Sequence, residues 1–407
     1  MSVQTTMNLT AMNAALKELY DGQVIENLVY ADNPFLAMVK KTSDFGGKYK
    51  PIPIITGVSQ GRSSTFSYAQ ANQTAALIQS FLLTRVSDYS IAQIDNQTML
   101  ASKTDKMAFL EGAKVVIDAA IRSCTNSVAS ALFRSGTGSI GVISTISTGV
   151  ITLTNPSDVT GFEVNMTLNA NATDGGTVRA AVGYVIAVNR SLGTVTVASS
   201  GLGGSAATPS GWAANDYLLV QGDNNAKASG LQAWLPSTVT ATSFYGVDRS
   251  ADPTRLGGIY YDGSAQPVEE ALIDHSSLIA REGGKPSVAL LPYASYAALE
   301  KSLGSKVQYV DLKGPAEVAF RGIMINGANG AIKVIPDRSA ISATAFLLQM
   351  DTWCLEGLGD VPQILRYGDG LEMLRVYNSD SGEVRVGAYY NLRTNAPGWN
   401  GQCLLSA

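Results

Sequence analysis

The chain has 407 residues, of which 15% are charged and 45% hydrophobic, with 40 glycines and a formal net charge of −4. This composition favours a folded, turn-rich protein of two or three domains, and the lack of a basic cluster argues against tight nucleic-acid binding. No apolar run approaches the ~18 residues that a membrane span needs. One histidine and three scattered cysteines exclude multi-histidine metal sites and a disulfide framework.

Changes in pattern and composition divide the chain into seven segments, which are 1–43, 44–95, 96–136, 137–226, 227–264, 265–375 and 376–407. The first is predicted to be an N-terminal arm with a short helix over Met12–Tyr20. Helices and strands are mixed in the second half of the chain, so the predicted fold class is α+β.

Residues 44–95 are predicted to form one long β-hairpin around a polar tip, Gly57–Thr74. The first strand contains Pro51 and Pro53, which exclude a central position in a sheet and indicate an edge or an isolated ribbon. Residues 76–94 are predicted to be a single return strand. A hairpin of this length is not stable alone in water, so it needs a surface that its own domain or a neighbouring subunit would supply.

Residues Lys103–Phe133 are predicted to form one long amphipathic helix. Apolar and small side chains recur at helical spacing, at Met107, Leu110, Ala113, Ile117, Ala120, Ile121, Cys124, Val128, Ala131 and Leu132. Ser102 and Asp105 make a plausible capping box at its start, and Arg134 with Gly136 marks its end. The helix would be roughly 45 Å long, so other elements must lie along it to cover its apolar face.

Residues 137–226 are almost bare of Lys and Glu and rich in Gly, Ser, Thr, Asn and Val. Short alternating runs such as GVITLT, YVIAVNRSLGTVTV and NDYLLVQGD are separated by turn signals. We interpret the segment as an inserted all-β domain, a small sandwich or barrel, with a surface loop at Gly201–Gly211.

Residues 227–264 are predicted to be an irregular return to the parent domain. Helices are predicted over 267–281 and 292–303, with the buried strand SVALLP between them. Short strands follow, at VQYV, GIMI, AIKVIP, AFLLQM, EMLRVY and VRVGAYYNL. His275 lies in the first of the two helices and is predicted to be a surface or boundary residue.

The sequence shows no catalytic constellation. No Gly-rich phosphate loop with Lys-Ser or Lys-Thr is present, and GLGGSA at 201–206 lacks the third glycine of a dinucleotide fingerprint. Glu269 and Glu270 are adjacent on a predicted helix, so they point to different faces and cannot form an acid–base pair. We therefore expect no enzymatic activity and no catalytic, cofactor-binding or metal-binding residues.

The order of these elements resembles a known family. The hairpin is preceded by the sequences NPFLAMVKK and TSDFGGKYKPIPI. It is followed by the long helix, by the α+β part and finally by the sequence RVGAYYNLRTNAPGWNG. In this order the chain is similar to the major capsid proteins of tailed bacteriophages over most of residues 20–136 and 227–405. The resemblance implies an N-terminal arm, an extended hairpin over the adjacent subunit, a spine helix in a peripheral domain, an axial domain over 265–375, and C-terminal strands that return to the peripheral domain.

The resemblance also implies a structural function. Such subunits assemble as hexamers and pentamers into an icosahedral shell around double-stranded DNA, in the virion capsid, after synthesis in the cytoplasm of a bacterial host. The implied partners are further copies of the chain, a portal and a separately encoded scaffolding protein, since no long scaffolding segment precedes the arm. The few basic residues predict weak contact with packaged DNA. No cofactor and no membrane are implied, and Arg62, Phe66 and Tyr68 at the hairpin tip are the candidate assembly contacts.

Two other functions stay open at this point. An unrecognised enzyme would require a polar cluster around His275. A β-rich fibre or adhesin would use residues 138–222 as its binding part.

Overall fold

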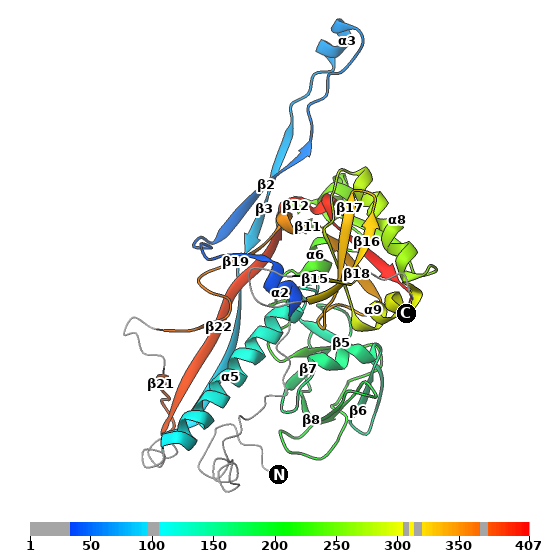
Figure 1. Ribbon diagram of the computed structural model, residues 1–407. Coiled ribbons are helices and arrows are strands. Elements are labelled where there is room, and N and C mark those ends of the chain that lie inside the picture. Colours follow the sequence, from blue (N-terminus) through cyan, green and yellow to red (C-terminus); the bar gives the residue numbers. More distant parts are fainter. Residues whose placement is uncertain (1–32, 97–105, 304–308, 313–319, 367–372, 407) are drawn as a thin grey trace.

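The computed structural model describes residues 33–96, 106–303, 309–312, 320–366 and 373–406. The body of the molecule combines helices and strands, and a hairpin projects far from it (Figure 1). The helix predicted over Met12–Tyr20 and the capping box at Ser102 and Asp105 lie outside the described residues. Among the helices of the described part, none has the length and hydropathy that a membrane span requires.

The long predicted helix is confirmed over the part that the structure describes, as α5 (Lys106–Ala131). It lies along a six-stranded sheet (Figure 1). The strands of this sheet are β1 (Lys40–Thr42), β4 (Val86–Asp95), β19 (Trp353–Gly357), β20 (Gln363–Ile364), β21 (Met373–Arg375) and β22 (Ser381–Thr394). Cys124 and Val128 of the helix share one core with Ala92 of β4 and Val384 of β22. Within the side chains that the structure describes, from Ile117 onward, the apolar stripe read from the sequence therefore packs in this core.

A second sheet has seven strands, which in spatial order are β13 (Ile259–Gly263), β23 (Gly401–Leu405), β18 (Thr344–Leu348), β14 (Val288–Leu291), β17 (Gly330–Pro336), β16 (Phe320–Gly327) and β15 (Tyr309–Leu312). Helices α8 (Val268–Arg281) and α9 (Tyr293–Leu303) pack on one face through Ala289 and Leu347. The other face, with Leu290 and Phe346, joins the core around α5. The predicted buried strand and both predicted helices are confirmed.

The sheets do not follow the segment boundaries drawn from the sequence. Segment 376–407 contributes β22 to the six-stranded sheet and β23 to the seven-stranded sheet. Segment 265–375 is likewise divided, because β19, β20 and β21 pair in the six-stranded sheet. Local pattern predicts where strands occur, but it does not predict which distant strand each one joins. The division into peripheral and axial domains therefore stays a prediction.

The inserted segment forms a closed barrel with strands β5 (Ser139–Ser147), β6 (Val150–Leu153), β7 (Thr167–Asn171), β8 (Gly183–Asn189), β9 (Thr194–Ala198) and β10 (Tyr217–Val220). Its own hydrophobic core includes the fully buried Ile143, Phe162 and Leu168. The chain enters and leaves at adjacent points, since Asn225 donates its backbone N–H to the carbonyl of Thr137 at 3.0 Å.

We expect that replacing residues 138–222 by a short Gly-Ser linker will leave the rest of the subunit folded. The barrel has a separate core, and its two connections lie side by side, so closing the gap costs little chain entropy. Circular dichroism and a cooperative urea transition of the shortened chain test this. If the shortened chain accumulates only as insoluble protein, the barrel belongs to the parent core.

The hairpin is shorter than predicted. It consists of β2 (Tyr49–Gly57) and β3 (Leu77–Thr84), with the short helix α3 (Phe66–Ala71) in the connecting loop. The prediction of one return strand over 76–94 is wrong, because the chain changes sheet at Arg85 and continues as β4 against β22. Burial explains the change, since Ala92 and Ile94 of β4 are 3% and 1% exposed. The two-stranded sheet confirms the isolated ribbon that the prolines indicated.

The remaining short elements connect these layers. They are α2 (Pro34–Met38), α6 (Leu231–Trp234), α7 (Pro253–Gly257), β11 (Ser243–Phe244), β12 (Val247–Asp248) and the 3-10 helices at Pro156–Gly161, Arg249–Ala251, Met350–Thr352 and Pro397–Trp399.

Candidate assembly surface

The far end of the hairpin carries the three residues predicted to make assembly contacts. Phe66 and Tyr68 lie on α3, at the tip of the projection in Figure 1, and are 80% and 65% exposed. Arg62 is also exposed and precedes this helix. The loop is closed within itself, because Thr74 and Gln60 exchange hydrogen bonds of 2.9 and 2.8 Å. The tip thus presents large side chains to the outside without joining the core of its own subunit.

The root of the hairpin, in contrast, is packed into the body by aromatic side chains. Phe81 of β3 is fully buried and meets Trp234 edge-on, with ring centroids 5.2 Å apart. Phe244 meets Trp234 at 5.0 Å, and the guanidinium of Arg249 lies 4.0 Å from the Phe244 ring centroid. Edge-on aromatic pairs and a cation over an aromatic ring each stabilise the fold beyond what the burial of apolar area contributes.

Buried hydrogen bonds fix the same root to β22. Asn391 is fully buried, and its side-chain amide donates to the carbonyl of Thr84 at 2.6 Å and to the hydroxyl of Tyr245 at 2.8 Å. The backbone carbonyl of Tyr245 in turn accepts from Leu82 N–H at 2.8 Å. The end of β3 therefore cannot move away from the body without leaving buried polar groups unpaired.

A buried carboxylate anchors the other strand of the hairpin. Glu356 of β19 has 0% exposure and accepts hydrogen bonds from Lys50 of β2, from Thr42 and from Arg393. Burial raises the pKa of this carboxyl group, but the three hydrogen bonds outweigh burial and lower the pKa to about 2. Both strands of the hairpin are thus held at the root, while the far end remains exposed.

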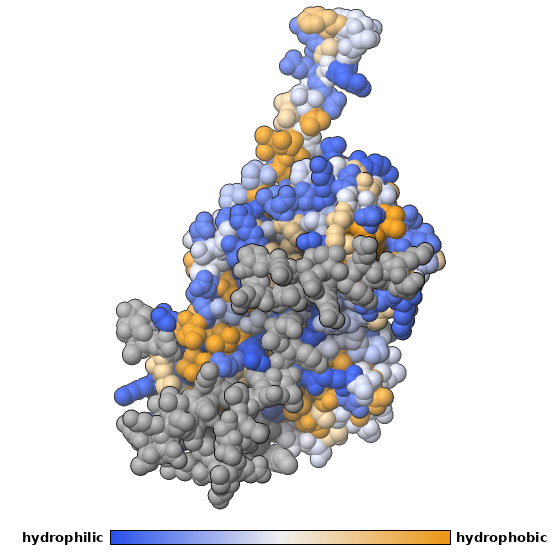
Figure 2. Space-filling model, viewed as in Figure 1, coloured by the Kyte–Doolittle hydropathy of each residue, from blue (hydrophilic) through white to orange (hydrophobic). Residues whose placement is uncertain are grey.

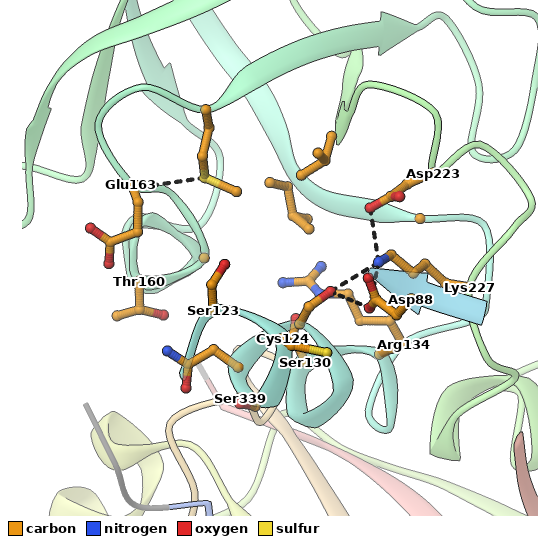
Figure 3. A pocket seen from close by; sticks show the side chains of 18 of the residues that line it. Asp88, Ser123, Cys124, Ser130, Arg134, Thr160, Glu163, Asp223, Lys227 and Ser339 are labelled. Atoms are coloured by element: carbon orange, nitrogen blue, oxygen red, sulfur yellow. Dashed lines mark hydrogen bonds and ion pairs between the residues drawn. The ribbon is translucent and has the colours of Figure 1, made fainter. Parts of the chain in front are cut away.

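A cavity of about 510 Å³ lies between the barrel and α5 (Figure 3). Lys227 is its central charge, and its ammonium group contacts Asp88 at 2.8 Å, Ser127 at 2.9 Å and Asp223 at 3.1 Å. Burial lowers the pKa of Lys227, but the two carboxylates outweigh it and the pKa is raised. The lysine thus stays protonated and links Asp88 of β4, Ser127 of α5 and Asp223, which follows the last barrel strand.

The chemistry of this cavity does not favour a nucleophile. Burial, and to a smaller extent the charge of Asp88, raise the pKa of the Cys124 thiol to about 12 against the opposing charge of Lys227. A thiol with such a pKa carries almost no thiolate at neutral pH. The cavity is therefore best described as the contact zone between the inserted barrel and α5.

The sequence-based prediction for His275 is wrong. The residue is 0% exposed, on the face of α8 that packs against β13 and β23, and its Nε2 lies 3.1 Å from the carbonyl oxygen of Ile259. Its ring is stacked on Tyr261 at 6.1 Å. Amphipathic spacing places His275 one turn from Leu272 and Ile279 on the buried face, a signal that could have shown its burial. This position gives no support to an enzyme centred on His275.

Acid will destabilise the subunit through His275. Burial lowers the pKa of the imidazole from 6.5 to about 4, so the unfolded chain binds the proton more readily than the folded chain. The stability that neutral His275 contributes is present above pH 6.5 and is lost as the pH falls toward 4. The loss is about 3 kcal/mol, at about 1.4 kcal/mol per pKa unit.

The test compares urea unfolding of the wild type and His275→Gln between pH 7 and pH 4.5. The wild type should lose more stability over this range than the variant, which lacks the only histidine. Parallel pH dependences in the two proteins would contradict the assignment.

Comparison of the sequence with family models found no match, and no curated protein matches it. Solved structures do match the fold. The cyanophage A-1(L) capsid asymmetric unit superposes with a TM-score of 0.54 at 12% identity, covering 94% of this chain and 95% of that chain. The holo-SrpI encapsulin complex from Synechococcus elongatus PCC 7942 has a TM-score of 0.48 at 8% identity, with 99% and 96% coverage. The capsid of a native GTA particle has a TM-score of 0.45 at 8% identity, with 99% and 100% coverage.

The cyanophage match covers nearly the whole of both chains. The resemblance read from the order of the elements is thus confirmed at the level of the fold, and this chain has the α+β fold of a tailed-phage major capsid protein.

Proposed function

We propose that this chain is the shell-forming subunit of a tailed-phage capsid and assembles as hexamers and pentamers into an icosahedral shell around double-stranded DNA. The observation that carries the proposal is a projecting hairpin, anchored at its root and exposed at its tip, on a body with a capsid-protein fold. A monomer gains nothing from exposing Phe66 and Tyr68 at the end of such a projection. A neighbouring subunit that covers them gains apolar contact area.

In this proposal the parts of the subunit have separate tasks. The hairpin contacts the adjacent copy through Arg62, Phe66 and Tyr68, and α5 is the spine of the peripheral domain. The seven-stranded sheet with α8 and α9 belongs to the axial domain, which meets its copies at the five-fold and six-fold centres. A portal and a separate scaffolding protein are the proposed further partners in the virion.

Contact with the packaged DNA is weak in this proposal. The chain has 29 basic and 33 acidic residues, and both arginines of the barrel are paired, Arg179 with Asp216 and Arg190 with Glu163. Strong binding of DNA requires several free cations that displace counterions from phosphates. Weak contact suits a container that must release its DNA.

Negative-stain electron microscopy of the purified wild-type protein tests the proposal. Closed shells, or rings of five and six subunits, are the expected result. Dispersed monomers would instead favour an enzyme, and elongated trimers would favour a fibre or adhesin.

A further inference from the structure

The barrel and the body of the subunit meet without a shared apolar core. Among the residues that the structure describes, the hydrophobic cluster of the barrel contains no body residue, and the cluster around α5 contains no barrel residue. On the visible face of the barrel, at the lower right of the body in Figure 2, hydrophobic residues are interspersed with hydrophilic ones, as on the surface of an independent domain. Moving the barrel relative to the body therefore costs little apolar burial.

The cavity between the two parts has a polar wall on the side of α5. The residues of this helix that line it are mostly small or polar, and they include Ser123, Asn126, Ser127 and Ser130. Hydroxyl and amide groups exchange their hydrogen bonds with water at little net cost. This wall can therefore become solvated when the barrel moves away from it.

The two linkers that connect the barrel to the body belong structurally to the barrel. On the entry side, the hydroxyl of Thr137 donates to the carboxylate of Asp174 at 2.6 Å. On the exit side, the side-chain amide of Asn225 donates to the carbonyl of Gly175 at 2.8 Å. Thr137 and Asn225 also share the backbone hydrogen bond described above. These linker residues therefore move with the barrel.

The body begins again at Arg134 and Lys227. The carbonyl of Arg134 accepts the backbone N–H of Gly230 at 2.9 Å, and the ammonium group of Lys227 is bonded to Asp88 of β4. Both residues are thus held by the body, although they lie within a few positions of the barrel linkers in the sequence.

Only short links remain between body and barrel, at Gly136 and Ala226. The φ angle of Gly136 is +90°, and a Cβ atom there would lie 3.2 Å from the carbonyl oxygen of Ala228. Glycine therefore suits both the backbone conformation of the entry link and the close approach of the exit segment. Two adjacent short links allow one domain to rotate relative to another by changes in a few backbone dihedral angles.

One ion pair joins the body to the barrel across this hinge. Arg134 Nη2 lies 2.9 Å from Asp158 Oδ1, and the two side chains are 20% and 9% exposed. Asp158 is on the 3-10 helix Pro156–Gly161, whose Val159 is buried in the barrel core, so Asp158 moves with the barrel. Arg134 is held by the body and is one of the residues around the cavity in Figure 3. The pair therefore fixes the angle between the two parts.

The distribution of charge fits this arrangement. Residues 137–226 contain two basic residues, which are paired within the barrel, and five acidic residues, which are Asp158, Glu163, Asp174, Asp216 and Asp223. Asp158 and Asp223 meet the body cations Arg134 and Lys227. Asp223 is only four residues from Lys227, so this pair stays close during a rotation. Asp158 is the acid whose contact a rotation breaks.

We propose that the barrel swings as a rigid unit about Gly136 and Ala226, and that the Arg134–Asp158 ion pair latches it against α5. Release of the latch lets one chain present its barrel at more than one angle to the body. The proposal concerns the single subunit and goes beyond the proposed function, so the two can fail independently.

The test measures a distance between the barrel and the body by double electron–electron resonance. Spin labels are attached at Leu192→Cys on the barrel and Ile273→Cys on α8, where the native side chains are 66% and 37% exposed. The three native cysteines are buried, so the labels react with the introduced ones. One distance should dominate in the otherwise unchanged, latched subunit.

Asp158→Asn removes the charge of the latch and keeps the size of the side chain. The ratio of swung to latched molecules should rise at least about tenfold, which corresponds to about 1.4 kcal/mol. Arg134→Gln breaks the same pair from the body and should have the same effect. The matched control is Glu163→Gln, because Glu163 also lines the cavity but pairs with Arg190 inside the barrel.

Hydrogen exchange of the same variants distinguishes a swing from unfolding. In a swing, the backbone amides of β5–β10 stay as protected in Asp158→Asn as in the wild type. A new distance that appears together with loss of this protection would show that the barrel melts, which overturns the rigid swing. Distances that Asp158→Asn and Arg134→Gln leave unchanged, or that Glu163→Gln changes equally, overturn the latch.

Discussion

Subunits in which residues 58–76 are replaced by an Asn-Gly turn will fold and stay soluble, but they will not form stable shells. The deletion removes the exposed Phe66 and Tyr68 and leaves every strand of the body intact. Gly57 and Leu77 are the last pair of the hairpin, so a two-residue turn can join them in register. We expect loss of assembled particles in sedimentation velocity, with an unchanged urea transition of the free subunit.

A point variant separates the tip anchors from the length of the loop. Phe66→Ser with Tyr68→Ser keeps the loop and removes only the large side chains. If this variant behaves like the deletion, the anchors make the contact. If the deletion itself yields normal, stable particles, the tip has no role in assembly.

The sequence predicted the elements of this fold better than their arrangement. Periodicity is a local property, so the apolar stripe of α5, the two helices α8 and α9 and the buried strand β14 could each be read from a short window. The strand β23 pairs with β13 across more than a hundred residues, and no local pattern records such a pairing. The change of sheet at Arg85 was missed for the same reason.

The candidate site was predictable only in part. The tip residues Phe66 and Tyr68 stood out because they are large and lie in a polar stretch. Glu356 was missed because a lone glutamate in a strand is normally solvated, and its partners come from three distant strands, which carry Thr42, Lys50 and Arg393.

Glu356→Gln will destabilise the subunit by about 3 kcal/mol, because removing one partner of a buried ion pair leaves the remaining charges uncompensated. Lys50 and Arg393 are 29% and 20% exposed at the side chain, so both can regain some water, which keeps the loss at the lower end of the range for buried pairs. The matched control is Glu383→Gln, which removes a partner of Arg385 whose side chain is 38% exposed. That change should cost less than about 1 kcal/mol.

The pH dependence gives the same test an independent readout. The pKa of Glu356 is lowered from 4.5 to about 2 in the folded subunit, so its contribution to stability is complete above pH 4.5 and is lost as the pH falls toward 2. The stability difference between the wild type and Glu356→Gln should therefore be largest near neutral pH and shrink below pH 4.5. Because Lys50 ties β2 to this carboxylate, the variant should also assemble more slowly, since a loosely held hairpin must be ordered when it meets its neighbour. A variant as stable as the wild type at pH 7 would show that the hairpin root is held by its aromatic packing and not by the ion pair.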